Sequence, residues 1–188
     1  MSCDITNGRI EQCKDSVSGL KAIYFINYDD LTPDSGLTYV GATDEIDTWE
    51  PSAVINLYKY ELKGANSFET TINSSRDNGT TFFQQTLTIQ LKRQDVATHK
   101  NVKLLAYGRP RIVVRTMTDQ FFLMGLTQGA DVTAGTVSSG TALGDFNGYN
   151  LTFEAMEVSP ANFIDVNNEN DLATAFAYDG TDATIVAS

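Results

Sequence analysis

The chain has 188 residues, of which 41% are hydrophobic, and its 24 Asp and Glu residues outnumber its 13 Lys and Arg residues. The resulting net charge of −11 argues against a protein that wraps nucleic acid, because such binding needs clustered basic side chains. The length suits one globular domain with its own core. The sequence has neither a run suited to a transmembrane helix nor a basic-then-apolar start, so we expect no membrane span and no signal peptide, and synthesis in the cytoplasm.

Residues 1–19 are polar and contain two turn signals, which predicts an amino-terminal arm. Cys3 and Cys13 lie in this arm, and the sequence leaves open whether they pair. Two cysteines and the single distant His99 match no familiar zinc-binding spacing, so we expect no metal and no cofactor.

The first strand is expected over residues 20–28, where both faces carry apolar side chains. Such a strand is typical of the centre of a sheet or of one covered on both sides. A short strand is expected over residues 37–41 and a longer one over 54–63. The only tryptophan, Trp49, lies between them and is expected in the core.

The strongest local pattern in the sequence is a long hairpin between residues 68 and 92. Hydrophobic and polar residues alternate on both sides of Asp77, Asn78 and Gly79, which form a tight-turn signal because Asn and Gly tolerate a positive φ. One face of the hairpin is therefore apolar and the other polar.

One amphipathic helix is expected over residues 94–107, where the apolar period changes to a helical one and Gly108-Arg109-Pro110 provides a stop. It is the only helix that the pattern predicts. His99 lies on it among polar neighbours and is expected to face solvent.

A strand pair is expected over residues 111–116 and 120–126, followed by a glycine-rich excursion that contains a strand over 131–137. Gly140, Gly144 and Gly148 precede a strand rather than a helix, so they do not resemble a phosphate-binding loop. The closing strand spans 149–158, and its Glu154 and Glu157 point to opposite faces, which excludes a shared acid/base role.

The segment after Pro160 is acidic and rich in Asn, Asp, Ala and Thr, and it has little expected core of its own. The sequence thus predicts an arm (1–19), a β-domain (20–160) and a carboxy-terminal extension (161–188), with both end segments held by neighbouring subunits. The predicted fold class is mainly β: a β-sandwich or partly closed β-barrel with a long hairpin and one flanking helix.

The order of elements over residues 3–160 resembles that of virion structural proteins of tailed bacteriophages, in particular tail-tube proteins and related tail ring proteins. The residues that carry this resemblance are 13–15, 19–21, 104–107, 122–125 and 139–149. Residues after 160 do not match a tail-tube pattern.

The resemblance implies a subunit that forms a ring, commonly a hexamer, by pairing strand edges with its neighbours. Stacked rings would form a channel in the virion tail, through which DNA passes without sequence-specific binding, and other tail or neck proteins would be partners. The acidic composition fits a lumen to which DNA does not adhere. The predicted inter-subunit contacts are the hairpin tip (Asp77, Asn78, Gly79) and the glycine loop (Gly140, Gly144, Asp145).

Two other functions are weighed against the ring subunit. A capsid decoration protein or a glycan-binding β-sandwich would present loop aromatics, for which Tyr39, Trp49, Phe146 and Tyr178 are candidates. An enzyme is disfavoured, because the sequence shows no Ser-His-Asp, Cys-His or metal-ligand arrangement and His99 lacks an orienting acid.

Overall fold

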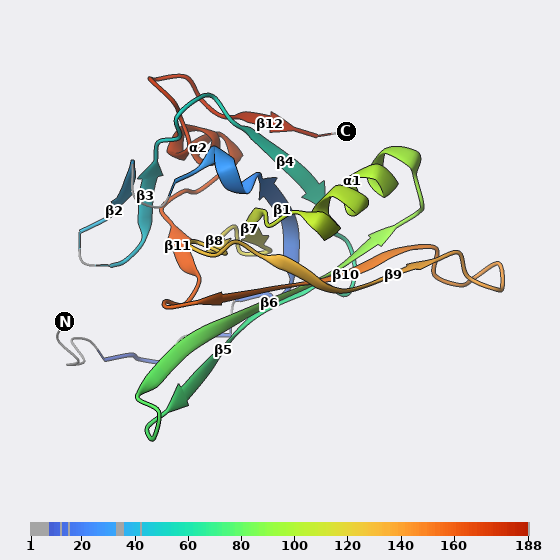
Figure 1. Ribbon diagram of the computed structural model, residues 1–188, viewed down its shortest axis with the longest axis horizontal. Coiled ribbons are helices and arrows are strands. Elements are labelled where there is room, and N and C mark those ends of the chain that lie inside the picture. The colour runs from blue at the N-terminus through green and yellow to red at the C-terminus, as the bar shows by residue number, and fades with distance from the viewer. Residues whose placement is uncertain (1–7, 12, 15, 33–35, 42, 188) are drawn as a thin grey trace.

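The computed structural model describes residues 8–11, 13–14, 16–32, 36–41 and 43–187, and these form two β-sheets with flanking helices (Figure 1). Sheet A contains, in spatial order, β12 (Thr184–Val186), β4 (Asn56–Glu61), β1 (Leu20–Ile26), β7 (Arg111–Thr116), β8 (Phe121–Met124), β11 (Asn162–Ile164), β3 (Ile46–Trp49) and β2 (Leu37–Tyr39). Sheet B contains β5 (Ser67–Ser75), β6 (Thr80–Lys92), β10 (Gly148–Glu157) and β9 (Asp131–Ser138). Over the described residues neither sheet closes into a barrel, so the sandwich prediction is confirmed.

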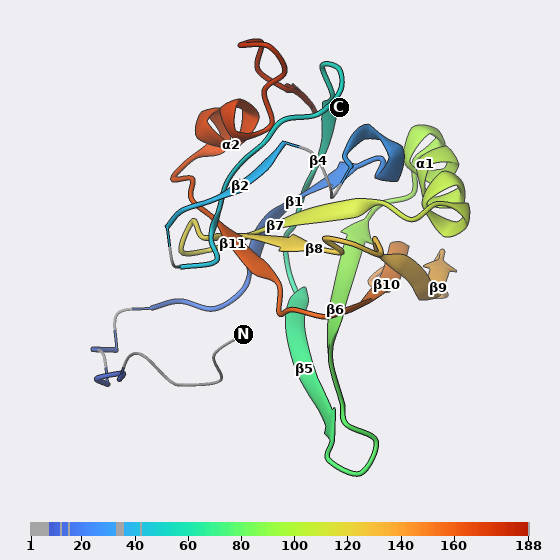
Figure 2. The same ribbon diagram turned by 60° about the vertical axis from the view of Figure 1, so that its left-hand side comes forward.

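The predicted hairpin is confirmed as β5 and β6, which pair in unbroken antiparallel register from Ser67 opposite Thr88 to Ser75 opposite Thr80. Gly79 has φ +63° at the turn, as the Asn-Gly signal requires. Alternation continues into β10, which pairs with the other edge of β6. Figure 2 shows the β5–β6 hairpin extending well beyond the body of the protein.

Strand β1 lies at the centre of the fold between β4 and β7, as its two apolar faces predicted. Ile23 and Phe25 pack toward sheet B, in a core shared with β6 and β10. Tyr24 and Ile26 face the other way, into a second core that contains the fully buried Trp49. The alternation of this one strand therefore produces two hydrophobic layers.

Helix α1 (Val96–Tyr107) forms where the sequence predicts it. The Asp95 carboxylate caps its start by accepting the backbone N–H of Thr98 at 2.9 Å. None of its residues is fully buried, and it meets the core through the partly buried Val102 and Leu105. The exposed side of the helix includes His99, as predicted.

The expectation of a single helix and of a coreless carboxy-terminal segment is wrong. Residues after 160 form β11, β12 and a second helix, α2 (Glu169–Ala175), which covers one face of sheet A. Leu172 and Phe176 are completely buried there. This end of the chain thus packs into the protein's own core, although the predicted division into 1–19, 20–160 and 161–188 stays a prediction.

The described residues of the amino-terminal arm are exposed up to Gly19, and Ile10 keeps 89% of its surface accessible. Cys13 is an exposed free thiol, whereas Cys3 lies outside the described residues. No helix in the described part of the chain is long and apolar enough to cross a membrane.

Candidate functional site

Sheet B carries both groups of residues that the sequence predicted as contacts, but at opposite ends. The hairpin tip (Asp77, Asn78, Gly79) precedes the start of β6, and the glycine loop (Gly140, Gly144, Asp145) lies where β9 turns into β10, beside the end of β6. The thirteen residues of β6 separate them by roughly 40 Å at about 3.4 Å per residue. The two groups therefore mark two ends of one sheet rather than one joint site.

The hairpin tip is a fully exposed turn. The N–H of Gly79 donates to the Arg76 carbonyl at 3.3 Å, and the N–H of Asn78 donates to the Ser75 hydroxyl at 3.3 Å. Asp77 has an exposed side chain at the same tip. The turn is stabilised within the chain, and its role in subunit contact stays a prediction.

The glycine loop is closed by Asp145, whose carboxylate accepts the backbone N–H groups of Thr141 and Ala142 at 2.8 and 2.7 Å. These bonds lower the pKa of Asp145 because they favour the charged carboxylate. A Cβ on Gly140, which has φ +72°, would lie 2.8 Å from the Cβ of Asp145. Gly144 faces open space. The structure thus brings Gly140 and Asp145 together and presents the exposed Leu143 at the tip.

The two sheets end in very different edge strands. Sheet A ends in β12 and β2, each of three residues, which are too short to template a further strand. Sheet B ends in β9, with eight residues and a bulge at Thr133 where its register with β10 shifts, and in β5, with nine residues. β5 has no bulge, no proline and no lysine, and Glu69 is its only charge. It lacks the usual features that protect an edge.

The backbone groups at the β5 edge can be assigned from the hydrogen bonds of β6. The N–H of Gln90 points to the β5 side, since it donates to the Asn66 side chain at 2.8 Å. Residues an even number apart along a strand direct their backbone N–H and C=O groups to the same side. The backbone groups of Gln84 therefore also point to β5, where they bond those of its partner Thr71. The neighbouring Ile72 therefore directs its N–H and C=O to the free edge.

The face of sheet B away from the core is mostly polar, although the exposed Phe82 and Met156 lie on it toward the hairpin. Register places these polar side chains there on β6 and β10: Gln84, Thr86, Thr88, Gln90, Asn150, Thr152 and Glu154. The same face carries Glu69 and Asp131, while Lys92 is its one basic side chain among the described residues of the four strands. A polyanion would meet mostly neutral amides and hydroxyls there, with little to bind its phosphates.

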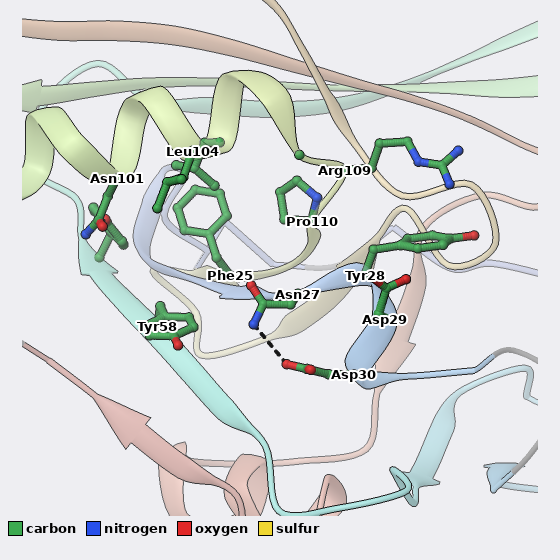
Figure 3. Close-up of a pocket in the computed structure, with 13 residues that line it drawn as sticks. Phe25, Asn27, Tyr28, Asp29, Asp30, Tyr58, Asn101, Leu104, Arg109 and Pro110 are labelled. Atoms are coloured by element: carbon green, nitrogen blue, oxygen red, sulfur yellow. Dashed lines mark hydrogen bonds between the residues drawn. The ribbon is translucent and has the colours of Figure 1, made fainter.

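A pocket of about 620 Å³ lies between α1, β4 and the end of β1 (Figure 3). Its apolar part contains Phe25, Tyr58 and Tyr60 together with Leu104 of α1. Tyr28, Asp29 and Asp30 of the 3-10 helix η1 (Tyr28–Asp30) form the other end, beside Arg109. We call this the α1 pocket. These residues come from three separate segments of the chain (25–30, 58–60 and 101–110), and nothing in the linear pattern indicated that they meet.

Arg111 is completely buried, although strand alternation alone gives no reason for it. Its guanidinium donates to three backbone carbonyls: Leu126 at 3.0 Å, Tyr28 at 2.5 Å and Leu31 at 2.9 Å. It also lies over the Tyr28 and Trp49 rings. Burial lowers the pKa of Arg111 because desolvation disfavours its charged form. The side chain thus joins the loop that contains η1 to the loop after β8.

Glu154 and Glu157 lie on opposite faces of β10, as predicted. Glu157 is buried, and its carboxylate accepts the backbone N–H groups of Thr127 and Gln128 at 2.9 and 2.8 Å. It therefore fastens the loop after β8. Among the described residues no group of three His, Cys, Asp or Glu side chains is arranged to hold a metal ion.

Glu169, the first residue of α2, fastens that helix to sheet A. Its carboxylate accepts the Tyr24 hydroxyl at 2.7 Å and the Lys59 ammonium at 2.7 Å. Burial acts to raise the pKa of Glu169, but the hydrogen bonds from Lys59 and Tyr24 outweigh it, so the pKa lies below its ordinary value. Burial, with the Glu169 bond, raises the pKa of the Tyr24 hydroxyl. The cluster is an anchor for α2.

The lowered pKa of Glu169 predicts a pH dependence. Its contribution to stability is complete above the unfolded-state pKa, near 4.5, and is lost as the pH falls through the lower folded-state pKa. We expect Glu169→Gln to be less stable than the parent at neutral pH and to lose less further stability between about pH 6 and about pH 3. Urea unfolding at several pH values measures this, with Glu69→Gln as the control on an exposed strand. An unchanged pH dependence in Glu169→Gln would contradict it.

Comparisons with protein-family models, with curated proteins and with solved structures found no match for this chain. The functional conclusion therefore depends on the geometry of the sheets and their edges.

Proposed function

We propose that this protein is a structural subunit that assembles into a ring or tube by pairing sheet B edges between copies. The single observation that carries the proposal is the nine-residue β5 edge, which is regular, nearly uncharged and lacks protection, while sheet A ends in three-residue strands. Unprotected edges of this length invite pairing with another chain. The complementary edge is the regular part of β9 in the next copy, residues 134–138, which follows the bulge at Thr133.

Pairing β5 of one copy with β9 of the next is a heterologous contact, because two different surfaces meet. Such a contact generates a closed ring if the rotation between copies closes, and a filament if it does not. The outward face of sheet B would then line a continuous inner surface. Its neutral amides and hydroxyls, with three carboxylates against one lysine, suit a channel for DNA in a phage tail.

The test replaces Ile72, whose N–H faces the free edge and whose side chain is 66% exposed. Ile72→Pro removes an edge donor without removing a bond to β6, since proline is tolerated on edge strands. We expect the parent protein to form rings or polymers in sedimentation and negative-stain microscopy, and the proline variant to lose at least about tenfold in association constant, or about 1.4 kcal/mol.

Ile72→Thr is the matched control, because it removes the same apolar side chain and keeps the N–H. It is expected to assemble like the parent, and both variants should keep the parent circular dichroism spectrum. A parent protein that stays monomeric at high concentration would overturn the proposal and favour a decoration or binding module. Undiminished assembly of Ile72→Pro would show that β5 is not the joint.

A further inference from the structure

We propose that the α1 pocket binds a basic segment of a partner protein, with an Arg or Lys side chain at its acidic end and an apolar side chain over its aromatic floor. The pocket lies between α1 and β4, and no residue of β5 lines it. This inference does not depend on ring assembly.

The floor of the α1 pocket consists mainly of aromatic side chains. Phe25 and Tyr60 pack edge to face with ring centroids 5.2 Å apart, and Asn101 fixes the Tyr60 hydroxyl at 3.1 Å. Leu104 stays 59% exposed above them. A volume of about 620 Å³ falls in the range of ligand pockets. The floor is thus preformed and suits an apolar side chain.

The acidic end of the pocket lies on η1. Asp29 is exposed, and its carboxylate interacts electrostatically with the buried Arg111 guanidinium. Asp30 accepts one bond, from the Asn27 amide at 3.0 Å, which is the dashed line in Figure 3, and both residues line the pocket together with Tyr58. Two carboxylates next to aromatic rings favour a cation, through both ion pairing and cation–π attraction.

The pocket lining holds one guanidinium, that of Arg109, against the two carboxylates of Asp29 and Asp30, and the buried Arg111 guanidinium lies over the Tyr28 ring from within the core. Arg109 lies over the Tyr28 ring, 4.5 Å from its centroid. It shows that this wall accepts a guanidinium on an aromatic face. With the net charge of −11, the protein also attracts cationic partners from a distance and repels anionic ones. Charge and apolar surface together therefore select a basic segment of a polypeptide over an anion or a neutral sugar.

The test titrates the full chain at low salt with the blocked peptide acetyl-Gly-Arg-Leu-Arg-Gly-amide and follows backbone amide shifts by NMR. We expect shifts confined to α1, η1 and β4, and an affinity that falls about tenfold in Asp29→Lys. Asp47→Lys makes the same charge change on β3, at the other side of sheet A from β4, and is expected to keep the affinity within about twofold of the parent.

Two further probes decide the ligand class: the acidic peptide acetyl-Gly-Glu-Leu-Glu-Gly-amide and maltose. Neither is expected to shift the pocket resonances. Equal binding of either probe at the pocket, equal loss of affinity in both lysine variants, or shifts spread over sheet B would overturn the proposal. Asp29 and Asp47 are both exposed, so each variant is expected to fold, as its amide spectrum checks.

Discussion

Replacing Arg111 by methionine is expected to lower the free energy of unfolding by about 3 kcal/mol or more, at roughly 1–3 kcal/mol for each buried acceptor left without a donor. The change would deprive the carbonyls of Tyr28, Leu31 and Leu126 of their common donor. Methionine fills much of the same volume, so the loss reports mainly on hydrogen bonding. Urea unfolding followed by circular dichroism measures it.

Arg109→Met is the matched control for Arg111→Met. Both guanidiniums lie over the Tyr28 ring, at 4.5 and 4.3 Å from its centroid, but Arg109 is exposed. Its replacement is expected to cost less than about 1 kcal/mol, the usual scale of an exposed cation–π contact. Equal stability of the two variants would show that the three carbonyl bonds of Arg111 contribute little.

The long hairpin and α1 could be predicted from the sequence because their information is local. The period-two alternation around Asn78 and Gly79 and the helical stripe after Asp95 act within about 15 residues, and both elements form where expected. The turn chemistry at Gly79 and the cap at Asp95 are themselves local bonds. These two elements could therefore be predicted from local patterns alone, without knowledge of their tertiary contacts.

The elements that sequence patterns missed are those that depend on distant contacts. Strand β3, four residues long, pairs with β2 and β11, from segments before and far after it. The burial of Arg111 depends on three carbonyls from two separate loops. The α1 pocket likewise joins Phe25, Tyr58 and Leu104 from three elements. The hydrophobic periodicity of a short stretch of sequence carries no information about contacts between distant segments.

The candidate inter-subunit contacts also include some features that local sequence predicts and others that depend on the sheet. The tight turn at Asp77, Asn78 and Gly79 forms as predicted, because the turn signal is local, while the role of these residues in subunit contact stays a prediction. The assignment of free backbone groups to Ile72 needed the register of β5 on β6 and the direction of the Gln90 N–H. Which side of a strand is free is a property of the sheet and not of the strand sequence.

Helix α2 also depends on tertiary contacts, and Phe176 is the residue that tests this. Seven residues are too few for a stable isolated helix, so burial must stabilise it. Phe176 is completely buried in the core that holds Trp49 and Leu172. Phe176→Ala is therefore expected to lower the free energy of unfolding by about 3–5 kcal/mol, the usual cost of such a truncation.

The consequence of Phe176→Ala should extend beyond the cavity that it leaves. The Ala183 N–H donates to the Ala173 carbonyl at 3.0 Å, and β12 follows directly along β4, so the whole end of the chain depends on the seating of α2. Hydrogen exchange is expected to rise over residues 169–186 before the β6 and β10 amides lose protection. Tyr178→Ala, which removes an aromatic ring that is 38% exposed, provides the control and should leave exchange nearly unchanged. Uniform loss of protection across both sheets in Phe176→Ala would instead mean that the carboxy-terminal segment unfolds only together with the rest of the protein.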